Sequence, residues 1–165
     1  MGWNKNTVGR LKRPTLKLIP IILIFIISGT IYCLIEIAYR GYTYYSMFLC
    51  AGMAGIAITF LNDWVYEFNT DFRTQCITAG LICSGIEFII GEIFNRDYSI
   101  WDYRGLWGTI KCLDSQVNVM FVCAWIAICA FAIPFLDYLQ WKLGMGEKPW
   151  YRIGDRIIRP WEEKE

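Results

Sequence analysis

Four long apolar runs, separated by short polar stretches, dominate the pattern of hydrophobic and polar positions along this chain. They cover about residues 18–39, 44–61, 75–94 and 117–136. A helix rises about 1.5 Å per residue, so about twenty apolar residues cross a hydrocarbon core about 30 Å thick. The pattern therefore predicts an all-α, polytopic membrane protein built as a bundle of four transmembrane helices.

Three segments follow from this pattern: a basic N-terminal segment (1–17), a transmembrane domain (18–140) and a polar tail (141–165). Twelve of the 16 lysines and arginines lie in the N-terminal segment, in the connector between the second and third runs, or in the tail. By the positive-inside rule, both termini are expected in the cytoplasm. The tail stretch WYRIGDRIIRPW mixes basic and apolar residues, which favours a surface helix on the lipid headgroups, with docking to a partner as the alternative.

Composition excludes several classes of function. The net charge is +1, which gives no basic field for nucleic acid, and there is no histidine for acid–base catalysis or metal binding. The seven cysteines form no C-x-x-C pair, and no G-x-x-x-x-G-K-[ST] loop occurs. Asp97, Asp102 and Asp114 share one loop, but their spacing fits no known metal motif. We expect no enzyme, cofactor or metal, and any use of ATP would require a separate ATPase.

One carboxylate lies deep in an apolar run: Glu87 is preceded by Ile86 and followed by three more apolar residues. A charged acid at bilayer depth costs about 2.5–3.5 kcal/mol, so it must face protein, water or a partner. Glu87 has no cation nearby in the sequence. Two interpretations stay open: a hydrogen bond that locks the helix bundle, or the functional group of a transport path.

Two further acids lie near the predicted outer ends of spans. Arg40 follows Glu36 by four residues, the favourable order for an ion pair on one helix face. Glu92 is close to the outer interface, where its side chain can reach the headgroups. Both are weaker functional candidates than Glu87.

Small residues mark helix surfaces for close packing. They recur at short intervals in the second and third apolar runs, as Ala51, Gly55, Gly80, Ser84 and Gly91. Four short helices bury little area by themselves. We therefore expect a homo-oligomer, or a complex with a partner membrane subunit or an ATPase, within the lipid bilayer.

Three motifs carry a resemblance to a known family: RGYTYYSMFLCAG at 40–52, the pair Glu87–Phe88 with Gly91, and IWDY at 100–103. Over about residues 31–136 the chain resembles the small bacterial membrane proteins named ABC-transporter type IV, or ABC transporter permeases. Members commonly continue the third motif with serine and a proline-containing loop, whereas RGLW follows here. The resemblance implies a permease-like subunit of the bacterial cytoplasmic membrane and brings no established substrate.

These features predict a transport component of unknown substrate that acts as an oligomer or with a partner ATPase. In this hypothesis Glu87 lines the path, and the outer loop motif Trp101–Asp102–Tyr103 covers its outer mouth. The alternatives are a membrane scaffold or regulator that docks partners through its tail and, less well supported, a holin-like pore.

Overall fold

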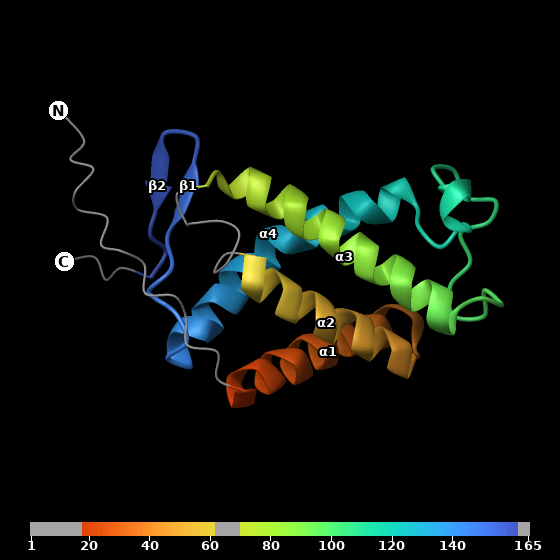
Figure 1. Ribbon diagram of the computed structural model, residues 1–165, viewed down its shortest axis with the longest axis horizontal. Coiled ribbons are helices and arrows are strands. Elements are labelled where there is room, and N and C mark those ends of the chain that lie inside the picture. Colours follow the sequence, from red (N-terminus) through yellow and green to blue (C-terminus); the bar gives the residue numbers. More distant parts are fainter. Residues whose placement is uncertain (1–17, 62–69, 162–165) are drawn as a thin grey trace.

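The computed structural model describes residues 18–61 and 70–161 and shows a helical protein (Figure 1). The described residues form four α-helices: α1 (Leu18–Arg40), α2 (Tyr45–Phe60), α3 (Phe72–Phe94) and α4 (Val119–Lys142). Helices α1, α3 and α4 are long and apolar enough to cross a membrane, whereas α2 has 16 residues and is shorter. The predicted helical architecture is thus confirmed, and three of its four helices, rather than all four, are long and apolar enough to span a membrane. The predicted basic segment 1–17 lies outside the described residues.

The helices form two antiparallel pairs. Helix α1 packs along α2, and α3 packs along α4, while α2 joins the pairs by contacting both α3 and α4 (Figure 1). Helix α1 barely touches α4. The core between the pairs includes Ile24 of α1, Ile58 of α2, Cys83 of α3 and Ile133 of α4. The weak contact between α1 and α4 leaves room for the cavity described below.

Glycines bring the paired helices together at short distance. A Cβ atom on Gly55 of α2 would lie 2.1 Å from the Ser28 hydroxyl of α1. A Cβ atom on Gly80 of α3 would lie 2.4 Å from the Ile126 side chain and 2.8 Å from its backbone in α4. Gly55 and Gly80 therefore serve the close packing of helices inside this chain.

Helix α4 extends further than the apolar run predicts. Pro134 lies inside the helix, which continues to Lys142 instead of ending near residue 136. The last turns contain polar residues, and Asp137 and Gln140 are nonetheless buried. The Tyr151 hydroxyl donates a hydrogen bond of 2.8 Å to the Asp137 carboxylate. A pattern of apolarity cannot detect a helix end that is stabilised by buried polar contacts.

The tail forms a β-hairpin, so the predicted surface helix is wrong. Strands β1 (Tyr151–Ile153) and β2 (Arg156–Ile158) pair antiparallel. The turn between them contains Gly154 at φ +58°, a left-handed conformation that glycine adopts without strain and that ends any helix there. Tyr151 is buried and anchors the hairpin against α3 and α4. Figure 1 shows the hairpin beside the start of α3. We call this the hairpin end of the bundle, and residues 95–118 mark the opposite loop end.

The hairpin also caps helix α3. The Asp71 carboxylate accepts hydrogen bonds from the backbone N–H of Arg73, in the first turn of α3, and of Gly154 in the hairpin turn, at 2.9 and 2.7 Å. These two bonds favour the charged form and lower the pKa of Asp71. One exposed carboxylate thus joins the start of a helix to the C-terminal hairpin.

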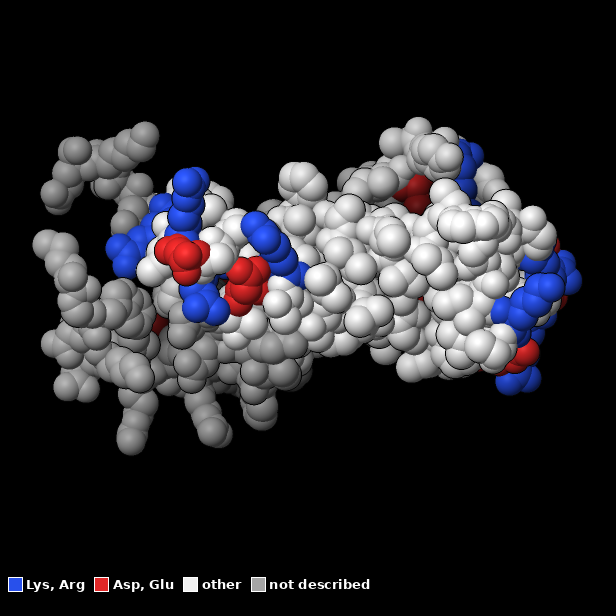
Figure 2. All heavy atoms as spheres, turned by 90° about the horizontal axis from the view of Figure 1, so that it is seen from above, with Lys and Arg blue, Asp and Glu red and all other residues white. Residues whose placement is uncertain are grey.

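Charged side chains gather at the two ends of the bundle, and the middle is almost free of them on the face seen in Figure 2. This distribution fits a bilayer around the middle of the helices, because exposed charges there would lose their hydration. Large apolar side chains are exposed along that middle section, among them Ile31, Leu34, Leu81 and Phe131. Such residues cover a lipid-facing surface.

The close approach of α3 and α4 can be tested at two glycines of the same helix. Gly80→Ala places a methyl group against the Ile126 backbone, and we expect it to destabilise the protein by about 1–3 kcal/mol. Gly85→Ala is the matched control, because nothing lies within 4 Å of a Cβ atom there. It should be neutral or stabilise the helix by roughly 0.5–1 kcal/mol. Unfolding in mixed detergent micelles measures both, and equal effects would contradict close packing at Gly80.

Candidate functional site

Glu87 lies in the interior of the bundle, on α3, with 4% of its surface exposed. Its two carboxylate oxygens have different partners. The Tyr103 hydroxyl donates to Oε1 at 2.8 Å, and the Trp125 indole N–H donates to Oε2 at 3.0 Å. The carboxylate therefore joins three elements: α3, the loop at 95–118 and α4. Each oxygen accepts one of these bonds and keeps a further lone pair.

Tyr103 reaches Glu87 because the loop that carries it is folded by its own hydrogen bonds. The Asn95 side chain accepts hydrogen bonds from the backbone of Ile100 and Trp101 and donates to the Trp101 carbonyl and to Gln116. The Trp101 indole N–H in turn donates to the Gln116 carbonyl at 3.3 Å. These bonds place the IWDY segment against the end of α3. Burial and the nearby Glu87 carboxylate raise the pKa of the Tyr103 hydroxyl, so it remains a donor.

The three residues of the outer loop motif have separate roles. Trp101 fixes the loop, and Tyr103 enters the bundle. Asp102 faces away and forms a two-point ion pair with Arg104, with distances of 2.9 and 2.8 Å. These contacts lower the pKa of Asp102 to about 2. Only Tyr103 of this motif contacts a predicted functional carboxylate.

Sequence reasoning missed Trp125, although a signal was present. Tryptophans of membrane proteins concentrate at the two interfaces, whereas Trp125 lies six residues into a long apolar run. A buried indole N–H also requires an acceptor. In the structure the ring stacks on Tyr32 of α1, with centroids 5.7 Å apart and planes inclined by 11°, and its N–H bonds to Glu87. A tryptophan in the middle of an apolar run thus indicates that a buried hydrogen-bond acceptor lies beside its indole N–H, and here this acceptor is Glu87.

The predicted ion pair of α1 is present. The Arg40 guanidinium lies 2.8 Å from the Glu36 carboxylate, and the Thr43 hydroxyl donates to the other carboxylate oxygen at 2.5 Å. Arg40 also donates to the backbone carbonyls of Tyr42 and Ile100, the latter in the loop that holds Tyr103. The pair therefore fastens the end of α1 to the same loop.

A cavity of about 350 Å³ connects these groups. We call it the polar chamber; it contains both Glu36 and Glu87. Its walls come from all four helices and from the loop at 95–118. The lining residues are Tyr32, Ile35, Glu36, Tyr39, Arg40, Met47, Glu87, Trp101, Tyr103, Phe121, Ala124, Trp125 and Ile128. Two carboxylates and one guanidinium thus meet six aromatic rings around one space. A few polar groups in a largely apolar cavity are typical of a small-molecule site.

A second cavity of about 410 Å³, the apolar chamber, adjoins the first. The two share Tyr32, Ile35, Trp125 and Ile128 as walls. The apolar chamber extends toward the hairpin end between α1, α2 and α4. Its lining residues are Ser28, Ile31, Tyr32, Ile35, Ala51, Ala54, Gly55, Ile58, Trp125, Ile128, Cys129, Phe131, Ala132, Phe135 and Leu136. No charged residue lines it. The two chambers thus adjoin, one lined by charged groups and the other without them.

The remaining predicted site residues lie around these chambers or away from them. Ala51 and Gly55 line the apolar chamber, and Gly80 packs against α4. The Ser84 hydroxyl bonds to the Gly80 carbonyl of its own helix at 3.0 Å. Gly91 lies against Gln116, and Glu92 is half-buried and lines neither chamber. Glu36 and Glu87 are thus brought together, and Glu92 is not.

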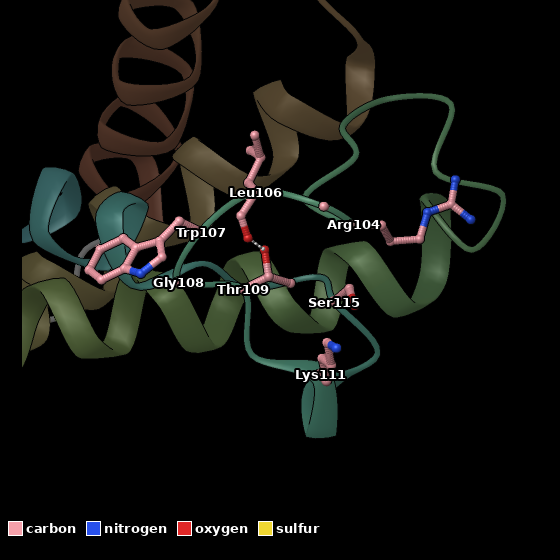
Figure 3. A pocket seen from close by; sticks show the side chains of 8 residues that line it. Arg104, Leu106, Trp107, Gly108, Thr109, Lys111 and Ser115 are labelled. Atoms are coloured by element: carbon pink, nitrogen blue, oxygen red, sulfur yellow. Dashed lines mark hydrogen bonds between the residues drawn. The ribbon is translucent and has the colours of Figure 1, made fainter.

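A hollow on the loop surface is a weaker candidate. All its lining residues come from the segment 104–115 (Figure 3). The side chains of Arg104 and Trp107 point away from each other, and the drawn hydrogen bond from Thr109 to the Leu106 carbonyl closes the loop on itself (Figure 3). Without polar groups that converge on one point, this hollow offers no recognition.

The three aspartates of the loop do not form a metal site. Within residues 18–61 and 70–161, no group of three or more cysteine, aspartate or glutamate side chains is arranged to hold a metal ion. Asp97 accepts hydrogen bonds from the backbone and hydroxyl of Ser99, which lower its pKa, and Asp102 pairs with Arg104. Their carboxylates serve local turns instead.

No protein-family model, no curated protein and no solved structure matches this chain. The resemblance to ABC-transporter type IV proteins therefore depends on the three motifs alone. Any function has to be argued from the chain's own residues, foremost the two carboxylates and the aromatic rings of the polar chamber.

The bond from the loop to Glu87 can be tested with Tyr103→Phe. The variant leaves a buried carboxylate oxygen without its donor, so we expect a loss of about 1–3 kcal/mol in unfolding free energy. Amide exchange of residues 100–109 should accelerate as well. Tyr39→Phe is the matched control, since that side chain is 90% exposed. Unchanged stability and loop exchange in Tyr103→Phe would show that Glu87 does not hold the loop.

Proposed function

We propose that the protein is a transport component of the bacterial cytoplasmic membrane that binds a small amphiphile in the two chambers between α1 and α4. The observation that carries the proposal is the pair of chambers itself: an aromatic chamber with carboxylates adjoins a chamber without charges. Ligand cavities of drug-sized molecules usually have volumes of about 300–1,000 Å³. The two chambers, of about 350 and 410 Å³, fall in this range.

Access from the surroundings of the bundle supports this proposal. Helix α1 barely touches α4, and residues at the rim between them are exposed: Ile35 by 60%, Ile128 by 46% and Phe131 by 81%. These side chains lie within the apolar helices, where lipid chains would surround them. An amphiphile dissolved in the bilayer could therefore enter sideways without crossing the charged ends.

The orientation and partners belong to the proposal as well. We propose that both termini, and with them the hairpin end, lie in the cytoplasm, and the distribution of lysine and arginine supports this orientation. The loop end and the polar chamber then lie toward the outside. Four helices do not enclose a complete path, so we propose that the chain acts as an oligomer or with a partner ATPase, as the resemblance to the ABC-transporter type IV proteins implies.

A second function, docking of a partner protein as a scaffold or regulator, is favoured by the hairpin. Strand β2 is exposed along its whole length, and Ile157 and Ile158 are 41% and 44% exposed. Its partner strand β1 is held against α3 and α4, so β2 presents a fixed edge at the hairpin end. An exposed strand edge can accept a strand of another protein.

The amphiphile proposal predicts that filling the apolar chamber prevents binding. Ala132→Phe adds a ring to the wall of this chamber, whereas Ala127→Phe adds the same ring to an exposed position of α4 outside both chambers. Native mass spectrometry of the gently extracted protein should show a retained amphiphile in the wild type and in Ala127→Phe but not in Ala132→Phe. A wild type that carries none, or equal retention in the two variants, would contradict the proposal.

The same spectra test the docking function. Replacing Ile157 and Ile158 together by serine should release a co-purified partner, such as an ATPase, while the retained amphiphile remains. Leu106→Ser is the control, because Leu106 is 51% exposed at the opposite end. A partner that survives the double replacement does not use the β2 edge.

A further inference from the structure

We infer that the amphiphile is a lipophilic organic cation with one positive charge, such as an alkylated or arylated ammonium ion. This inference rests on the proposed function and specifies its substrate class. The polar chamber would receive the charged centre of the ligand beside Glu87, and the apolar chamber would receive its hydrocarbon groups.

Only one of the two carboxylates in the polar chamber has a cationic partner, so an ionised Glu87 would leave one negative charge there without compensation. Glu36 and Arg40 form an ion pair at 2.8 Å, and the guanidinium also bonds to two backbone carbonyls. Glu87 has only neutral donors, Tyr103 and Trp125. Among the described residues, no lysine or arginine forms an ion pair with it. A bound monovalent cation would supply the missing counter-charge.

Aromatic rings surround the position that such a cation would occupy. Tyr32 stacks on Trp125, and Tyr103 stacks on Phe121 with centroids 4.7 Å apart. All four rings line the polar chamber. The faces of Trp, Tyr and Phe attract cations, and organic ammonium ions are recognised in this way. The two donors to Glu87 therefore belong to two aromatic stacks that flank the carboxylate.

Other ligand classes fit the chamber less well. An anion such as a phosphate headgroup would meet two carboxylates, and the guanidinium in the chamber, Arg40, already has Glu36 as its counter-ion. A small metal ion takes six or more oxygen ligands at short distance, whereas the wall here is mostly aromatic and apolar. A lipophilic cation needs neither a free guanidinium nor a dense oxygen shell.

Two probe ions of similar shape and opposite charge test whether the site selects its ligand by charge. Tetraphenylphosphonium and tetraphenylborate carry four phenyl groups each and have opposite charges. With the full chain in lipid nanodiscs, radiolabelled tetraphenylphosphonium should bind saturably, and tetraphenylborate should not compete with it. This comparison uses the wild type alone and so does not depend on the folding of any variant. Equal or tighter saturable binding of tetraphenylborate would overturn the inference.

Glu87 can be tested against a matched acid of the same helix. Glu87→Gln should weaken tetraphenylphosphonium binding at least about thirtyfold, the effect of removing one member of a buried charge pair. Glu92→Gln should leave the affinity unchanged, since Glu92 lines neither chamber. Glu87→Asp keeps the charge and should retain part of the binding. A Glu87→Gln variant that elutes as a folded protein and binds as tightly as the wild type would overturn the inference.

Failure of this inference can be told from failure of the proposed function. If tetraphenylborate or a neutral amphiphile binds, and Ala132→Phe prevents that binding, the chambers hold an amphiphile and only its charge is assigned wrongly. If the protein binds neither probe ion and retains no amphiphile in native mass spectra, both fail together. Retention of a zwitterionic phospholipid without any binding of tetraphenylphosphonium also overturns the assignment of a lipophilic cation.

Discussion

The burial of one carboxylate constrains the whole loop end of this bundle. Glu87 requires hydrogen bonds in an apolar interior, because a buried polar group without a partner costs about 1–3 kcal/mol. Its two donors come from different parts of the chain, Tyr103 from the loop and Trp125 from the facing helix. The loop must therefore fold back into the bundle, and α4 must turn its tryptophan toward α3. Asn95 and Gln116 stabilise this arrangement from outside.

The same contacts explain why the bundle contains a space instead of a closed core. Tyr103 stacks on Phe121 and Trp125 stacks on Tyr32, so large rings stand between α1 and α4 and form walls of the polar chamber. Further along, the facing positions are small: Ala51, Ala54 and Gly55 on α2 and Ala132 on α4. Rings at one end and small residues at the other leave a space that the chain's own side chains do not fill.

Much of the helical architecture could be predicted from sequence, because apolar length and helical spacing are local properties. The four helices lie close to the four apolar runs, and the Glu36–Arg40 pair follows from a spacing of four residues. The partners of Glu87 could not be predicted in this way. Their contacts join residues 16 and 38 positions apart, and nothing in the local pattern specifies which donor approaches which oxygen. The hairpin of the tail could not be predicted for a similar reason, since it depends on Asp71, at the N-cap of α3, and on Asp137 of α4.

The capping of α3 has a consequence for the order of assembly. Asp71 accepts the N–H of Gly154, which is 83 residues further along the chain. During synthesis, α3 emerges long before Gly154 exists, so the Asp71 carboxylate can at first accept only the Arg73 N–H. The hairpin end can close only when the last helix is complete and the tail has emerged. The C-terminal hairpin therefore forms last, and it stabilises the bundle after the helices have packed together. A chain truncated before residue 151 would lack the contacts of the hairpin with Asp71 and Asp137.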